Sequence, residues 1–204
     1  MARSLSDKHS FEYDEDSRPI ITTERLILRP LSVEKGDAES LVWLLADNHL
    51  RRWFGMRPLK TIAEAEAFIE RYSSCLHAVT EKGKDKLIGL VQSSFCFERC
   101  GALIGYCLSK EYEGKGYMTE AVLAIEDYVF SHWGYWGKDG AEDVKDIYAH
   151  VFVGNDASRR VLDRCGFHFV DSQENVYNPY GLVDDEDTFC TTVGDFEWIM
   201  RNAA

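Results

Sequence analysis

A short glycine-containing loop constrains the fold of this chain more than any other feature of the sequence. Residues 102–109 form an apolar, strand-like run, and residues from 114 to 133 carry apolar side chains at helical spacing. Gly114 and Gly116 lie where one pattern gives way to the other. Glycine permits left-handed dihedral angles and close approach to a ligand, and the first amides of a helix point outward beside a partial positive charge. The segment therefore predicts a loop that binds a phosphate or pyrophosphate.

Two common phosphate-binding motifs do not fit this loop. A Walker loop needs Ser or Thr after Gly-Lys, but Gly116 follows Lys115, and Ser109 stands where the first glycine belongs. The dinucleotide-binding pattern would need glycine at Thr119. A nucleotide-dependent phosphotransferase is therefore disfavoured, while a purely structural strand–helix turn stays open for the glycines alone.

A second informative stretch follows the apolar run 147–153. Asn155 is a natural N-cap residue, and Ser158 falls in the first turn of the helix that it would begin. Gly166 is a suitable C-cap for that helix. Taken alone, both Asn155 and Ser158 could serve only as capping or solvated side chains.

The remaining pattern predicts a mixed α/β fold in one domain. Residues 1–19 are polar and acidic and are interpreted as a flexible tail, so the domain spans 20–204. Residues 171–195 are interpreted as a long functional lid or a disordered connection. The expected strands are 26–30, 76–80, 87–95, 102–109, 147–153 (buried on both faces), one starting at 167–170, and 196–200; the expected helices are 38–46, one beginning at 61, one from 114 and 155–165, with 134–144 as a turn-rich linker.

Charge and composition exclude some classes of partner. The chain has 23 Lys and Arg against 35 Asp and Glu, a net charge of -12, which disfavours nucleic acid and would attract a cationic substrate. No apolar run is long enough to span a membrane, and the N-terminus lacks the apolar core of a secretory signal. The six cysteines are scattered without a CxxC pair. These features predict a cytoplasmic protein with no membrane or nucleic-acid partner.

In combination, three segments resemble the GNAT superfamily of acetyl-CoA-dependent N-acetyltransferases, and in particular its ribosomal-protein N-terminal acetyltransferase branch. They are Thr22–Pro30, the loop and helix start Glu113–Ala121, and Asn155–Phe167 with its Asn-x-x-Ser and Gly-Phe pairs. They occur in the family's order and at its spacing, over about residues 20–200. The resemblance implies a mostly antiparallel sheet that splays between two adjacent parallel strands and is flanked by helices.

The resemblance also implies the coenzyme A site. The pyrophosphate would lie on the backbone of the loop, and the pantetheine arm would enter between the splayed strands like an extra strand. Asn155 would bond the pantetheine, and Ser158 would donate a proton to the thioester sulfur. The loop residues in this role are Glu113, Gly114, Lys115, Gly116, Tyr117 and Met118, and the strand residues are Cys107, Leu108 and Ser109.

Two positions depart from the family pattern. Many relatives have Gln or Arg where this chain has Glu111, so the Glu111 side chain should point away from the phosphates. Many members use a Tyr as acid where this chain has Leu162, which leaves Ser158 as the candidate.

The general base is left open by the sequence. Glu174 lies roughly where the branch places a glutamate, although an ungapped register puts Tyr177 there; Glu98 and relayed water are the alternatives. The three histidines in strand-like runs are interpreted as structural: His77, His150 and His168. Cys96 and Cys100 are not accompanied by other residues at the spacing of metal ligands, so no metal site is expected. Aromatic residues that could line the acceptor pocket are Trp53, Phe54, Tyr177 and Tyr180.

We therefore expect direct transfer of acetyl from acetyl-CoA to a primary amine, with no covalent enzyme intermediate. The acceptor would be a protein N-terminus or a small cationic amine, and the enzyme a monomer or homodimer. The alternative is a non-catalytic acyl-CoA-binding sensor on the same fold, which would need neither Ser158 nor a base.

Overall fold

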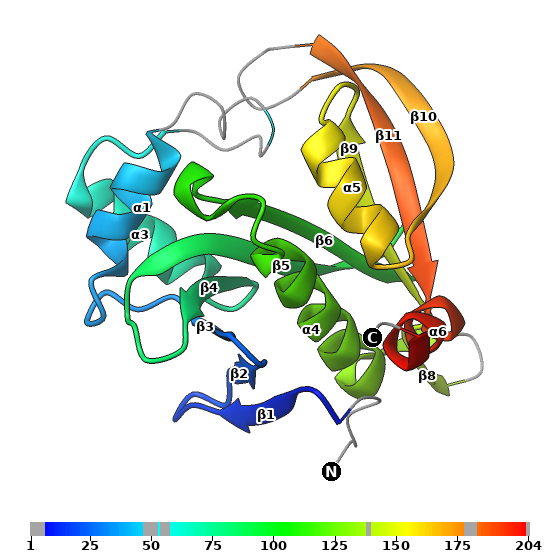
Figure 1. Cartoon of the computed structure of the whole chain (residues 1–204), viewed down its shortest axis with the longest axis horizontal. Helices are drawn as coiled ribbons and strands as arrows, with labels where there is room; N and C mark the ends of the chain where they lie inside the picture. The colour runs from blue at the N-terminus through cyan, green and yellow to red at the C-terminus, as the bar shows by residue number, and fades with distance from the viewer. Residues whose placement is uncertain (1–6, 47–52, 54–57, 138–139, 178–182, 203–204) are drawn as a thin grey trace.

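A nine-stranded sheet forms the centre of the molecule (Figure 1). The computed structural model describes residues 7–46, 53, 58–137, 140–177 and 183–202. The sheet order is β1-β2-β3-β4-β5-β6-β9-β11-β10, and the β6–β9 pair is its parallel pair. The mixed fold with a mostly antiparallel sheet is thus confirmed. The strands are β1 (Ser10–Tyr13), β2 (Pro19–Thr22), β3 (Leu26–Pro30), β4 (Leu76–Glu81), β5 (Leu87–Cys96), β6 (Gly101–Leu108), β9 (Asp146–Phe152), β10 (His168–Tyr177) and β11 (Val183–Thr192).

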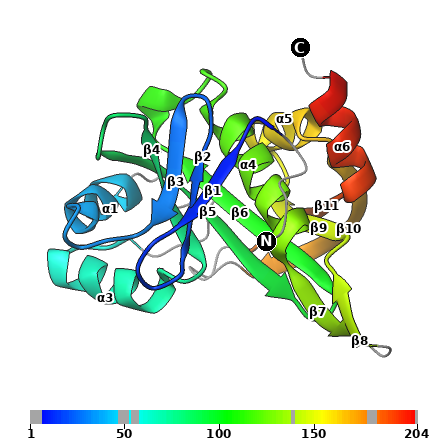
Figure 2. The same ribbon diagram turned by 90° about the horizontal axis from the view of Figure 1, so that it is seen from below.

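Helices cover both faces of the sheet with separate apolar cores. One core joins the sheet to α4 (Tyr117–His132), α5 (Asp156–Arg164) and α6 (Val193–Asn202). The other joins it to α1 (Asp37–Leu45) and α3 (Ile62–Tyr72), which lie side by side (Figure 2). In the part of the chain that the structure describes, no helix combines the length and apolarity needed to cross a bilayer.

The parallel β6–β9 ladder is short. It pairs Ala102 with Ile147, Leu103 with Tyr148 and Ile104 with Ala149, and the described pairing ends there. Beyond this point β6 remains paired with β5, and β9 with β11. The two strands therefore separate toward their carboxyl ends, as the resemblance implied.

β9 is not buried on both faces, contrary to the expectation for this strand. Ile147, Ala149 and Val151 are buried, whereas of the residues that alternate with them Tyr148 is half-buried and His150 is exposed. The reason is that the second face of β9 borders the opening between the strands instead of a helix.

The C-terminal element is helix α6, so the prediction of a strand over 196–200 is wrong. Thr192 and Asp195 form a capping box: each side chain accepts a hydrogen bond from the other residue's backbone N–H. Phe196 is fully buried in the core, and Val193 and Met200 pack against it from the same helical face. Their helical spacing, preceded by the capping box, was the signal that identifies this helix.

Three further segments are more ordered than expected. The described parts of 171–195 are not disordered, because most of them belong to the paired strands β10 and β11, with β11 between β9 and β10. Residues 134–144 are a hairpin of β7 (Gly134–Gly137) and β8 (Gly140–Asp143) instead of a linker. The tail expected over 1–19 is wrong at residues 10–13, which form β1 against β2.

A buried ion pair fastens the start of α1 to the sheet. Arg29 of β3 makes a two-pronged contact with Asp37, at 2.7 Å and 2.9 Å. The Asp37 carboxylate also accepts the Ser32 N–H, at 2.7 Å. The Asp37 side chain is 0% exposed and that of Arg29 6% exposed.

Replacing Asp37 with Ala should lower the free energy of unfolding by about 3–5 kcal/mol, because it leaves the Arg29 charge buried without its partner. Urea denaturation measures this loss. The matched control is Glu197→Ala, which breaks the exposed Glu197–Arg201 pair and should cost less than about 1 kcal/mol. Equal losses in the two variants would contradict the structural role of the buried pair.

Candidate functional site

A cleft of about 820 Å³ occupies the opening between β6 and β9. The carboxyl half of β6 forms one wall, and β9 with α5 forms the other. The loop before α4 closes one end, and β11 contributes to the opposite end. The cleft therefore passes from one face of the sheet toward the other, between strands whose ladder has ended.

The loop before α4 has the geometry expected of an anion-binding turn. Gly114 and Gly116 have φ angles of 73° and 78°, in the region that favours glycine. Gly116 is the N-cap of α4 and has no side chain that could cap the helix. The first amides of α4, beginning at Tyr117, are therefore available to a ligand, and the positive end of the helix dipole faces the same place.

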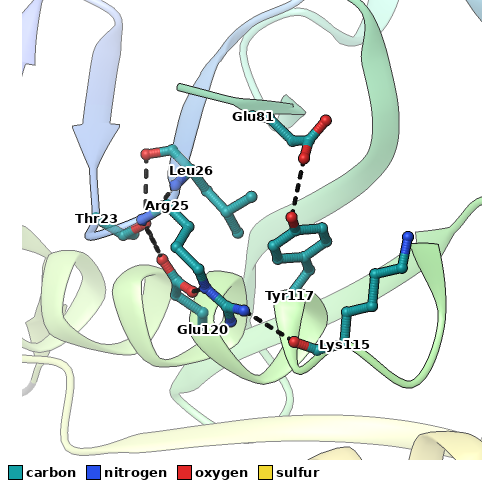
Figure 3. Close-up of polar contacts among 7 residues, drawn as sticks. All are labelled: Thr23, Arg25, Leu26, Glu81, Lys115, Tyr117 and Glu120. Carbon is teal, nitrogen blue, oxygen red and sulfur yellow. Dashed lines mark hydrogen bonds and ion pairs between the residues drawn. The ribbon is translucent and has the colours of Figure 1, made fainter. Parts of the chain in front are cut away.

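Arg25, in the turn between β2 and β3, clamps this loop (Figure 3). Its Nη1 donates to the Lys115 carbonyl at 2.9 Å, and its Nε donates to Glu120 of α4 at 2.6 Å. The guanidinium also lies 4.6 Å from the centre of the Tyr117 ring. These contacts join the turn between β2 and β3 to the glycine loop and to the first turn of α4.

Glu120 is the partner on which the clamp depends. Burial would raise the pKa of its carboxyl, but hydrogen bonds from the Thr23 hydroxyl and from Arg25 outweigh burial and hold that pKa below its usual range. Tyr117 is fixed in a similar way, because its hydroxyl donates to Glu81 of β4 at 2.9 Å (Figure 3). The loop is thus held from the protein side and keeps its outer amides free.

α5 places Asn155 and Ser158 on the other wall of the cleft. The Asn155 side chain accepts the Ser158 N–H at 3.2 Å, so Asn155 is the N-cap of α5. Tyr106 of β6 reaches across the cleft, where its hydroxyl lies 2.9 Å from Ser158 Oγ and 3.1 Å from the Ser158 carbonyl. Burial raises the pKa of Tyr106 far above its ordinary value, so this hydroxyl keeps its proton at neutral pH.

Tyr106 and two arginines line the cleft without having been predicted from the sequence. Arg160 and Arg164 line the cleft from α5, four residues apart and so on one face of the helix. Their charges suit a phosphate group near the glycine loop. The spacing on α5 was visible in the sequence, but their position beside the loop was not.

The structure brings most of the expected residues together and leaves some outside. Ser109 does not line the cleft, and its N–H donates to Ile88 of β5 at 2.8 Å. Neither Glu174 nor Glu98 lines the cleft, and both are exposed. Glu111 is exposed and lies outside the lining, as expected. The predicted residues that line the cleft are Cys107, Leu108, Glu113, Gly114, Gly116, Tyr117, Met118, Asn155 and Ser158.

The other candidates have mixed positions. Trp53 lines the cleft, whereas Phe54 and Tyr180 lie outside the described residues. The Lys115 ammonium lies 5.0 Å from the centre of the Tyr112 ring and does not line the cleft. Across the described ranges, no three His, Cys, Asp or Glu side chains gather as metal ligands would.

Comparison with protein families decides the family of this chain. The family described as "Acetyltransferase (GNAT) domain" matches residues 25–168, which include the clamp, the glycine loop and α5. The chain belongs to the GNAT acetyltransferase family. Enzymes of this family take their acetyl group from acetyl-CoA, and the donor set of the cleft fits that substrate: helix amides and arginines for phosphates, and an open strand edge for amides.

Relatives of this GNAT protein include bacterial proteins named as N-acetyltransferases. "Uncharacterized N-acetyltransferase YoaA" of Bacillus subtilis is 26% identical over 157 residues, which cover 73% of this chain and 82% of the relative. "Probable N-acetyltransferase YjcK" of the same organism is 37% identical over 113 residues, covering 53% of this chain and 56% of the relative.

Solved structures share the fold of this GNAT protein. A GNAT-family acetyltransferase from Bacillus anthracis has a TM-score of 0.71 at 20% identity, covering 85% of this chain and 98% of that one. Ribosomal-protein-S5-alanine acetyltransferase from Vibrio fischeri has a TM-score of 0.67 at 22% identity, covering 87% and 98%. The microcin C7 self-immunity acetyltransferase MccE, in complex with acetyl-CoA and AMP, has a TM-score of 0.67 at 20% identity, covering 84% and 94%.

Replacing Gly114 with Ala should weaken coenzyme A binding at least about fivefold, which corresponds to about 1 kcal/mol of backbone strain at a positive φ. A Cβ at Gly114 would meet no atom within 4 Å, so the change acts through the backbone and not through a clash. Isothermal titration calorimetry with coenzyme A measures the effect.

The matched control for this prediction is Gly36→Ala. Gly36 has nearly the same φ, 74°, and also precedes a helix, but it lies before α1 and does not line the cleft. It should lose similar stability and keep the wild-type affinity for coenzyme A. Equal affinity in both variants would refute the role of the loop.

Proposed function

We propose that this protein is an N-acetyltransferase that transfers acetyl from acetyl-CoA directly to a primary amine. The observation that carries the proposal is the early end of the β6–β9 ladder beside the glycine loop. An acyl-CoA substrate needs both features at once, because its pyrophosphate requires amide donors and its pantetheine amides require an open strand edge. The relatives named as N-acetyltransferases support the same reaction.

The open edge of β6 also suggests which backbone groups receive the pantetheine. The Ser109 N–H points toward β5, where it bonds Ile88. Backbone groups of successive residues in a strand point to opposite sides, so those of Tyr106 and Leu108 point toward β9. We place the pantetheine hydrogen bonds on these two residues, in preference to Cys107 and Ser109.

Ser158 is the residue that we propose for the leaving group. The breaking C–S bond leaves a thiolate, which is stabilised by a proton donor placed beside it. The Tyr106 hydroxyl has a single hydrogen, with the Ser158 carbonyl and Ser158 Oγ both within reach as acceptors. We propose that it is donated to Oγ in the reacting complex, which leaves the Ser158 hydrogen free to point at the sulfur. Leu162, where many relatives have the acid Tyr, is fully buried in the apolar core and takes no part.

The acceptor is proposed to be a peptide N-terminus or a small amine that is cationic in solution. The net charge of -12 favours a cation over an anion as the incoming partner. A cytoplasmic location, with its supply of acetyl-CoA, agrees with this activity.

The test of this function uses purified protein, acetyl-CoA and a panel of primary amines that includes peptides with free N-termini. We expect release of free thiol together with a matching acetyl mass gain on one class of amine. Thermal stabilisation by acetyl-CoA without turnover on any amine would instead support a sensor and would contradict the proposal.

Ser158→Ala should lower kcat on the order of 10²-fold and change the KM for acetyl-CoA less than about twofold, because the lost interaction forms chiefly in the transition state. Tyr106→Phe keeps the Ser158 hydroxyl but removes its partner, so its kcat should lie between that variant and the wild type. Steady-state kinetics measures both. A wild-type kcat in Ser158→Ala would remove Ser158 from the mechanism.

A further inference from the structure

His150 occupies the first position on β9 beyond the β6–β9 ladder. Ala149 is the last residue of β9 paired with β6, and its side chain lies in the core beneath α4. Side chains alternate along a strand, so His150 projects from the opposite face. Gly105, the next residue of β6, stands across the opening and has no side chain to fill it; both residues line the cleft.

The neighbours of His150 determine which ring nitrogen can accept a proton. Nδ1 lies 3.3 Å from the Thr188 hydroxyl and 3.7 Å from Glu186 Oε2, both on β11. A carboxylate beside Nδ1 favours the tautomer that carries its hydrogen there. Nε2 is then left with its lone pair.

The two side chains are partly shielded from water. Glu186 is 18% exposed and His150 30% exposed, and both line the cleft. Burial raises the pKa of Glu186, while the charge of a protonated His150 opposes that rise. The two groups therefore lie close enough to interact electrostatically within the cleft.

We propose that His150 is the general base of the acetyl transfer, oriented by Glu186, and that the acceptor amine reaches the thioester from the sheet face opposite Ser158. This rests on the proposed function and revises the interpretation of His150 as structural. Unlike His150, Glu174 and Glu98 do not line the cleft. Glu186 is a positioning residue for His150.

The step balances in atoms and charge. The ammonium gives one proton to His150 Nε2, and the neutral nitrogen forms the C–N bond with the carbonyl carbon while the C–S bond breaks. The nitrogen loses two protons in all. One passes through His150 to solvent. The other makes up for the proton that Ser158 gives to the sulfur, so the hydroxyl of Ser158 is restored.

The walls around His150 indicate the class of acceptor. Trp53, Phe152 and Val176 also line the cleft and contribute apolar surface, and Glu186 is the carboxylate next to the base. An amine with a single charge on an apolar stem matches this combination, because the stem contacts the aromatic and aliphatic walls. A polyamine would leave further charges against apolar surface.

The test compares His150→Gln with the wild type, with 2-phenylethylamine as the acceptor. We expect kcat at neutral pH to fall at least about 100-fold, in the range of general-base contributions, with the coenzyme A affinity unchanged by calorimetry. The deficit should shrink as the pH rises toward about 10, where the free amine loses its own proton.

Other charged groups on the strands around His150 and Glu186 are Asp171 on β10, its partner Arg99, and Asp184 on β11.

Four further variants sharpen this test. Glu186→Gln should show an intermediate loss of kcat, and His150→Asn, a shorter amide, repeats the base deletion if His150→Gln folds poorly. Glu66→Gln removes an exposed carboxylate of α3 and should match the wild type. Full activity of folded His150→Gln, or a larger loss in Glu174→Gln, would overturn the assignment.

The outcomes separate this inference from the proposed function. Absence of turnover with every amine in the wild type would refute the function. Turnover by the wild type with an unaffected His150→Gln would refute the base and leave the function standing. A kcat/KM at least about tenfold higher for spermidine than for 2-phenylethylamine, about 1.4 kcal/mol in transition-state binding, would refute the apolar class of acceptor.

Discussion

The separation of β6 from β9 is the constraint on which the rest of the site depends. Parallel strands normally satisfy each other's backbone hydrogen-bonding groups along their length. Here the pairing between β6 and β9 ends at Ile104 and Ala149, although both strands continue. The chain tolerates this because β5 and β11 still hold the outer edges of the two strands. The inner edges are left for a ligand, so this part of the binding site is built from main-chain groups, which substitutions other than proline leave in place.

The cleft has ends of opposite chemical character, and each lies on a different side of the sheet. Arg160, Arg164 and the start of α4 make one end suitable for phosphates. His150 and Glu186 make the other end suitable for an ammonium group. The two substrates of a transfer would therefore approach from opposite directions and meet between the strands.

The sequence was informative where the chemistry is local. Turn geometry, helix capping and alternation along a strand act over a few residues. For this reason the sequence could predict the loop at Gly114 and Gly116, the N-cap at Asn155 and the strands from 76 to 108. β11 could not be recognised in this way, since acidic residues run along it. One of them, Asp187, is buried and pairs with Arg159 of α5, a partner that lies far away in the sequence. The contacts of Arg25 and the pairing of His150 with Glu186 likewise exist only in the folded chain.

The Arg25 clamp has a consequence for how the protein is made. The loop at 114–116 is fixed by a residue some 90 positions earlier, since Arg25 contacts Lys115, and the cleft is completed by Glu186 of β11. Contacts between such distant segments close late in folding. Almost the whole nascent chain would thus have to leave the ribosome before it could retain coenzyme A. Binding of coenzyme A would then indicate that the sheet is complete.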